Sequence, residues 1–185
     1  QAHSRWVSTA RFLDSSFLSA GADSASMHMG TIDGKESGVA PHMLPIITDS
    51  DDATVKIWDV GRAGKKKPKL LSSSNQLHSR GIFSLEVAGD TVVCGSKDKT
   101  VTVSKITPGG LSSQPLARYA LHSGVVKAVD VQSNGVVFAS GSQDRSVCIK
   151  DTRVGSTQSA EVELTDCFGG GVFCVQFGPS NEGSQ

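Results

Sequence analysis

Short stretches in which apolar and polar residues alternate recur along this chain, and turn-forming residues separate them. Val55 and Ile57, for example, alternate with polar neighbours. Alternation with a period of two predicts a β-strand with one buried face. The acidic stretch 49–52 just before this strand predicts a tight turn. The pattern therefore predicts an all-β fold of short strands joined by turns.

The turn and the strand after it return at a constant interval. The turn residues Asp52, Asp98 and Asp144 are 46 residues apart in the sequence. His78 and His122 stand upstream of the last two of these turns, where further strand patterns begin. A period in the forties with several short strands per unit indicates a repeat architecture, in which each unit packs on its neighbours.

This pattern resembles the WD40 family of β-propellers, whose units of roughly 40–45 residues each contribute four strands. The resemblance rests on the Trp58-Asp59 pair that ends one strand, on the Asp spacing and on the upstream histidines, and it covers nearly the whole chain. It implies a WD40-type β-propeller. Because a ring of seven units needs roughly 300 residues, a chain of this length predicts a partial, open arc of about 3–4 four-stranded blades.

The repeat divides the chain into units of unequal regularity within a single propeller segment, 1–185. The predicted units are approximately 3–36, 40–71, 78–120 and 122–164, with the start of a further unit at 167–185. Only 29 residues separate Asp23 from Asp52, and Gly and Pro punctuate the stretch between them. We therefore expect the unit 40–71 to lack a first strand.

In WD40 blades that keep the family signature, a His, a Ser or Thr, the turn Asp and the Trp form a hydrogen-bonded chain that ties a loop to a strand. The residues that match it by position are Thr48, Asp52, Trp58, Asp59, His78, Asp98, His122, Ser140 and Asp144. Lys150 replaces one Trp, Cys94 and Ser104 replace two members in another unit, and the unit 40–71 has no histidine that matches the signature position. We therefore expect no blade to hold all four groups. An absent partner leaves buried polar groups at a cost of about 1–3 kcal/mol, which predicts blades less rigid than consensus ones.

Composition narrows the class of function. Eighteen basic and eighteen acidic residues give no net charge, so nothing steers the whole chain toward nucleic acid or an anionic membrane. The sequence shows no long apolar run or signal-peptide pattern, and its four cysteines form no metal-binding spacing. These features favour an intracellular protein, cytoplasmic and/or nuclear, with reduced and buried thiols.

No motif for catalysis or for a cofactor is present in the sequence. The acidic stretch 49–52 lacks the Gly and the distal Glu of a calcium loop, and Gly169-Gly170-Gly171 has no following Lys-Ser/Thr. The recurrent histidines stand at unit openings, which indicates a structural role. We therefore expect no enzyme activity, no cofactor, no metal and no small-molecule substrate.

The resemblance implies a scaffold that binds other proteins through rim loops. Since the histidine-bearing and Asp-bearing loops share one rim in the family, the candidate partner-binding residues there are Arg80, Lys97, Lys99, Lys127 and Arg145. Asp151 and Arg153 also resemble the Trp-Asp-x-Arg box by which some WD40 proteins dock on the adaptor of a cullin-RING ubiquitin ligase, which implies a substrate receptor. A third reading is a G-protein β-like signalling subunit, because residues 10–14 resemble a blade of that protein.

Overall fold

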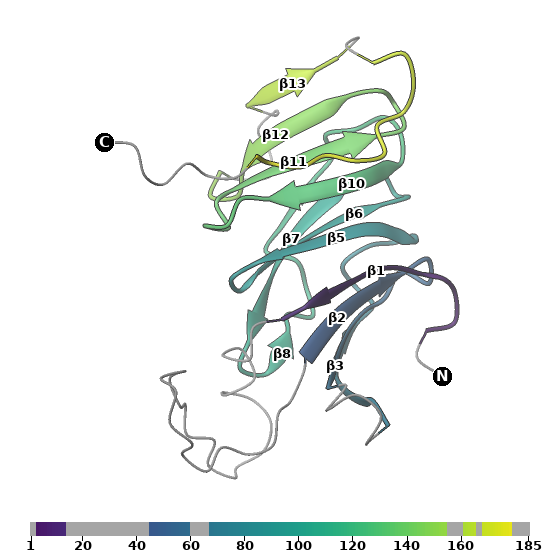
Figure 1. The fold of residues 1–185 in the computed structure, drawn as a ribbon, viewed down its shortest axis with the longest axis vertical. Coiled ribbons are helices and arrows are strands. Elements are labelled where there is room, and N and C mark those ends of the chain that lie inside the picture. The colour runs from purple at the N-terminus through teal and green to yellow at the C-terminus, as the bar shows by residue number, and fades with distance from the viewer. Residues whose placement is uncertain (1–2, 14–44, 60–66, 155–160, 166–167, 179–185) are drawn as a thin grey trace.

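The computed structural model describes residues 3–13, 45–59, 67–154, 161–165 and 168–178. The strands are β1 (Val7–Phe12), β2 (Pro45–Ser50), β3 (Val55–Asp59), β4 (Lys69–Ser74), β5 (Ile82–Ala88), β6 (Thr91–Ser96), β7 (Val101–Thr107), β8 (Gly110–Leu111), β9 (Ala117–Tyr119), β10 (Val126–Val131), β11 (Val137–Ser142), β12 (Val147–Asp151) and β13 (Val162–Leu164). They form three antiparallel sheets, which follow one another along the molecule (Figure 1).

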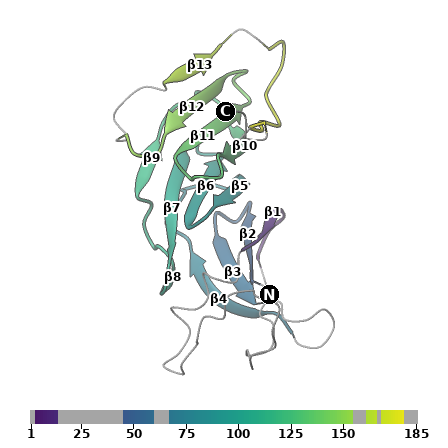
Figure 2. The same cartoon turned by 60° about the vertical axis from the view of Figure 1, so that its left-hand side comes forward.

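Neighbouring strands within each sheet mostly follow one another along the chain. The first sheet has the order β1-β2-β3-β4 and the third has the order β10-β11-β12-β13. In the second sheet β5, β6 and β7 are followed by two short strands that both pair with β7. Figure 2 shows β9 and β8 beside opposite ends of β7. The strands β1, β5 and β10 lie next to one another and bring the three sheets into contact.

The first sheet differs from the predicted unit division. Strand β1 pairs with β2, and Ala10 lies opposite Thr48 in the ladder. The expectation that the unit 40–71 lacks a first strand is therefore wrong, because β1 supplies it from before residue 14. A search for a constant repeat period does not find the pairing of β1 with β2, since residues 14–44 separate the two strands in the sequence. The part of the predicted unit 3–36 that follows residue 13 lies outside the described residues.

The core consists of two apolar layers, one on each side of the second sheet. Between the first and second sheets the buried residues include Ile47, Val55, Ile57, Ile82, Leu85, Val92 and Cys94. Between the second and third sheets they include Val93, Val101, Tyr119, Val126, Val129 and Phe138. This arrangement explains why strands of the second sheet are apolar on both faces, as in β6, where every residue is buried.

Glycine lets adjacent sheets approach closely. A Cβ atom on Gly95 would lie 2.6 Å from a Val126 methyl group of the next sheet. A Cβ atom on Gly141 would meet a Val172 methyl group at the same distance. Residues 168–178, which lie in the predicted start of a further unit, pack there on the third sheet, and no strand is assigned to them. In the first sheet, the equivalent position is occupied by Asp49.

The cysteines divide by location. Cys94 and Cys148 are free and buried, as predicted, and burial raises the pKa of the Cys148 thiol to about 11 and that of Cys94 well above its usual value. Such thiols are unreactive at neutral pH. Cys174 is exposed, contrary to the prediction, because its segment has no sheet outside it among the described residues. Cys167 lies outside them. Within the described ranges, no helix is long and apolar enough to span a membrane.

Candidate interaction surface

The three turns that carry Asp52, Asp98 and Asp144 lie at one edge of the sheets, together with the histidine-bearing loops before β1, β5 and β10. We call this edge the loop rim. In the second sheet, the Asp98 carboxylate accepts hydrogen bonds from the backbone N–H of Ser79 and of Thr100, both at 3.0 Å. It also accepts one from the Thr100 hydroxyl at 2.6 Å. One carboxylate therefore holds two loops together.

The same arrangement is repeated in the other two sheets. Asp52 accepts the backbone N–H groups of Ser4 and Thr54, at 2.8 and 3.0 Å. Asp144 accepts those of Ser123 and Ser146, at 2.7 and 3.0 Å. Burial by itself would raise the pKa of each carboxyl. The hydrogen bonds from hydroxyl, backbone and histidine donors outweigh it and hold the pKa of Asp52, Asp98 and Asp144 well below its usual range.

The first sheet contains the whole four-residue network. His3 Nε2 lies 2.8 Å from the Thr48 hydroxyl, which also accepts a hydrogen bond from Trp58 Nε1 at 3.0 Å. His3 Nδ1 contacts Asp52 at 3.3 Å and Thr54 at 2.9 Å. The expectation that no blade holds all four groups is therefore wrong. Sequence spacing assigned His3 to a separate unit, because 49 residues separate it from Asp52. Asp59 ends β3 opposite Lys69.

The second and third sheets keep the histidine but obtain its hydroxyl partner from different strands. In the third sheet, His122 Nε2 lies 2.8 Å from the hydroxyl of Ser140 on β11. In the second sheet, His78 Nε2 lies 2.9 Å from the hydroxyl of Thr102 on β7. Cys94 stands directly opposite Thr102 in the ladder, and Cys148 stands directly opposite Ser140. The second sheet therefore has the thiol on its second strand and the hydroxyl on its third, whereas the third sheet has the hydroxyl on its second strand and the thiol on its third.

This exchange of the hydroxyl and the thiol between the two strands predicts a non-additive double substitution. Thr102→Val leaves the buried His78 Nε2 without its partner and should destabilise the chain by about 1–3 kcal/mol. Adding Cys94→Ser restores a hydroxyl on the facing strand and should recover a large part of that loss, about 1 kcal/mol or more. Urea denaturation of the two single variants and the double variant measures the coupling. Additive effects would contradict the exchange.

The Trp position is filled differently outside the first sheet. Lys150 is fully buried, with its ammonium group 6.0 Å from the centre of the Tyr119 ring. Ser104 is buried, and its hydroxyl has no hydrogen-bond partner among the described residues. Burial lowers the pKa of His3 and His122, and the neighbouring carboxylates offset this only in part, so both rings are neutral at pH 7.

The five cations predicted to bind partners lie on the loop rim or beside it. We call them the cationic patch: Arg80, Lys97, Lys99, Lys127 and Arg145. The Lys97 backbone N–H donates to Gly81 O at 2.8 Å, which joins the turn to the histidine-bearing loop. The Lys127 ammonium lies 3.7 Å from the centre of the Phe83 ring and so links the third sheet to the second.

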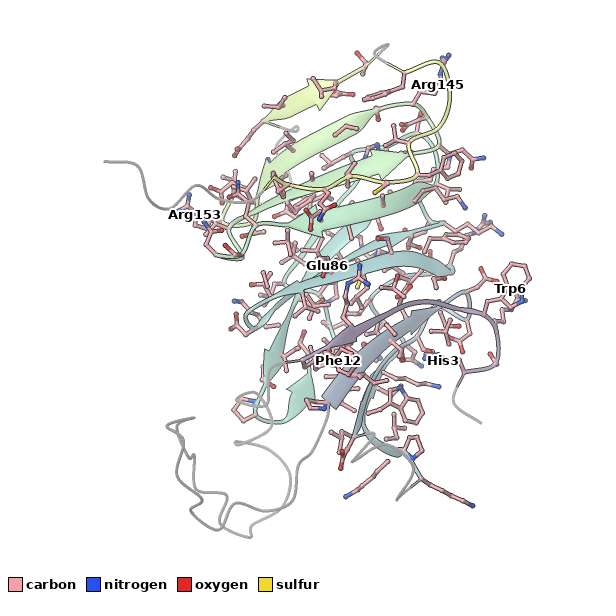
Figure 3. All side chains as sticks on the ribbon, viewed as in Figure 1. His3, Trp6, Phe12, Glu86, Arg145 and Arg153 are labelled. Atoms are coloured by element: carbon pink, nitrogen blue, oxygen red, sulfur yellow. The ribbon has the colours of Figure 1, made fainter. Side chains whose placement is uncertain are left out.

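The remaining two candidates lie on the opposite edge. The Arg153 guanidinium donates to Asp151 through Nε at 3.0 Å, and its backbone N–H donates to the same carboxylate at 2.8 Å. These donors lower the pKa of Asp151 to about 2. Figure 3 shows Arg145 and Arg153 on opposite sides of the molecule. The two groups of candidate residues therefore belong to two separate surfaces.

Comparison with protein families identifies the repeat. Residues 113–151, which contain β9, β10, β11 and β12, match the family model described as "WD domain, G-beta repeat". This segment is a WD40 repeat. Among solved structures, the WD40 β-propeller domain of Doa1 matches with a TM-score of 0.65 at 19% identity, over 95% of this chain and 46% of that one. The predicted all-β, WD40-type partial arc is confirmed. The chain spans about half the length of that structure.

A curated relative shares a shorter region with this chain. LIN-1 of Lotus japonicus, a candidate E3 ubiquitin-protein ligase, is 32% identical over 66 residues. The match covers 36% of this chain and 4% of LIN-1. Among the described residues of this chain, no group of three or more His, Cys, Asp or Glu side chains is arranged to hold a metal ion.

Proposed function

We propose that this WD40 segment is a non-catalytic scaffold that binds other proteins through its loop rim. The observation that carries the proposal is the repeated fixing of two loops by one carboxylate, seen at Asp52, Asp98 and Asp144. Loops that are fixed before a partner arrives lose little conformational entropy on binding. The histidine rings and carboxylates of the networks bond groups of their own sheet, which supports a structural role for them. The buried free thiols support an intracellular location.

A random-peptide library tests the scaffold proposal. Peptides selected on the purified chain are labelled, and their affinity is measured by fluorescence anisotropy. We expect the loop-rim variant Arg80→Ala/Lys97→Ala to weaken their binding by about tenfold, which corresponds to about 1.4 kcal/mol. The matched control is Lys67→Ala/Lys69→Ala, which removes the same charge from another exposed site. Failure to select peptides, or binding that is insensitive to the loop-rim variant, would contradict the proposal.

A second candidate function is substrate recognition for a cullin-RING ubiquitin ligase. The match to LIN-1 favours it, since that relative carries the name of a candidate ubiquitin ligase. The Arg153 side chain is 72% exposed beside Asp151 and so is accessible for the contact that the Trp-Asp-x-Arg resemblance implies. Size-exclusion chromatography of the chain with purified adaptor tests it. A complex that Arg153→Ala abolishes and Arg145→Ala leaves intact would support it, and absence of any complex would contradict it. The G-protein β-like reading stays a prediction.

A further inference from the structure

The cations of the patch differ in their pairing from other cations of both edges. On the loop rim itself, Arg5 pairs with Asp51 at 3.0 Å and Arg118 pairs with Asp98 at 3.6 Å. On the edge opposite the loop rim, Lys105 forms an ion pair with Asp90, and Arg153 forms one with Asp151. In the cationic patch, by contrast, none of the five side chains forms an ion pair with a described residue. Arg80, Lys97, Lys99 and Arg145 are exposed, and Lys127 is half-buried against Phe83. The loop rim over the second and third sheets therefore presents unneutralised positive charge.

The carboxylates of the same rim do not cancel this charge. Asp98 and Asp144 accept backbone and hydroxyl hydrogen bonds inside their turns, and they are mostly buried. Asp51 is paired with Arg5, whose guanidinium lies 3.0 Å away. Acidic groups of the rim are thus already engaged, whereas the cations of the patch remain available to a partner.

Two of the exposed cations stand at positions with an unusual backbone conformation. Lys99 and Arg145 both have a φ of 73°, in the left-handed region that favours glycine. Each stands directly after its turn Asp, and the equivalent residue of the first sheet is Ala53, with a φ of 64°. A long cationic side chain at this position carries a conformational cost that glycine would avoid. Lys99 and Arg145 therefore place exposed cations at positions that glycine could occupy with less strain.

An exposed aromatic side chain extends the same edge onto the first sheet. Trp6 is 83% exposed, and its carbonyl oxygen accepts the Asp51 backbone N–H at 3.0 Å. Asp51 in turn packs on Gly81, where a Cβ atom would lie 2.2 Å from Asp51 Oδ1. Gly81 is adjacent to Arg80, so the edge runs without a break from Trp6 to the cationic patch. Figure 3 shows Trp6 and Arg145 on the same side of the molecule.

We infer that the partner of the loop rim is an acidic peptide segment that places carboxylates on the cationic patch and an apolar side chain against Trp6. This inference rests on the proposed scaffold function and specifies its partner by chemistry. Exposed cations attract carboxylates at long range and raise the rate of encounter. An exposed tryptophan is the residue type that most often contributes strongly to binding at an interface.

The test uses two labelled peptides, one alternating Glu and Ser around a central Leu, the other with Gln in place of each Glu. The informative variant is Lys99→Gly/Arg145→Gly, because glycine suits the left-handed φ and the thermal midpoint should stay the same or rise. We expect this variant to bind the acidic peptide about fivefold more weakly, and Trp6→Ala to weaken it as well. Added salt should weaken binding to the wild-type chain.

The control Lys67→Gln/Lys69→Gln removes the same charge elsewhere and should bind like the wild-type chain. Equal weakening by this control, or no binding of the acidic peptide, would overturn the inference. Equal affinity for the Gln peptide would also overturn it, while leaving the scaffold proposal intact. If a single-stranded oligonucleotide of matched charge displaced the labelled acidic peptide more strongly than the unlabelled acidic peptide does, the patch would be a nucleic-acid site and the inference would be wrong. The library selection decides the scaffold proposal separately, because it does not depend on peptide charge.

Discussion

Replacing Asp49 with asparagine should remove a pH-dependent loss of stability of about 3–5 kcal/mol between pH 4 and pH 7. Asp49 is fully buried between the first and second sheets, and neither carboxyl oxygen has a hydrogen-bond partner among the described residues. Burial raises the pKa of Asp49 from 3.8 to about 7, and Thr9 and Arg11 offset only part of this rise. The side chain occupies the position at which the other sheets have Gly95 and Gly141.

The sign of the effect follows from the direction of this shift. Because the pKa of Asp49 is higher in the folded chain than in the unfolded chain, the folded chain holds the extra proton between about pH 4 and pH 7. Stability therefore falls as the pH rises through this window. Asparagine is similar in shape to the protonated carboxyl group and cannot ionise, so it removes this dependence.

Urea denaturation of the wild-type and Asp49→Asn chains at pH 5 and pH 8 measures the effect. The two chains should be similar at pH 5, and Asp49→Asn should be the more stable at pH 8. Asp51→Asn is a suitable control, because Asp51 lies two residues away in the turn and is only partly buried. A stability difference between Asp49→Asn and the wild type that does not change with pH would show that Asp49 is not protonated in the folded chain.

Asp98→Ala should destabilise the chain by about 3–5 kcal/mol at pH 7. The substitution leaves the backbone N–H groups of Ser79 and Thr100 without their acceptor and removes the contact with His78. The pKa of Asp98 is lowered in the folded chain, so its stabilising contribution is present above about pH 4 and is lost as the pH falls. The difference between wild type and Asp98→Ala should therefore narrow below pH 4.

Thermal and urea denaturation of Asp98→Ala and Asp98→Asn between pH 3 and pH 7 test this prediction. The two backbone N–H groups donate to different oxygens of Asp98, and asparagine keeps one of these two acceptors, so Asp98→Asn should cost less than Asp98→Ala. If Asp98→Ala unfolds the chain, Asp98→Asn still reports the pH dependence. Equal stability of wild type and Asp98→Asn at pH 7 would show that the negative charge of Asp98 adds nothing to the turn.

The sequence by itself determined the all-β class, the WD40 repeat and the regular geometry of the second and third sheets. Alternating residues around Val55 and the constant spacing of Asp98 and Asp144 are local signals, and strand pairing between consecutive segments follows from them. The paired His78 and Asp98 could be predicted because only 20 residues separate them. Contacts between residues that are close in the sequence can be predicted from periodic residue patterns.

Only the tertiary structure decided which distant residues complete each blade. It placed β1 beside β2 and His3 beside Thr48, because strand pairing depends on complementary edges and loop closure costs little more as the connection lengthens. It assigned the partner of His78 to Thr102, since either residue of a facing pair can direct a hydroxyl at the ring. It also showed that Asp49 is buried. The sequence around Asp49 could not predict this, because the second sheet, which is distant in sequence, covers the side chain.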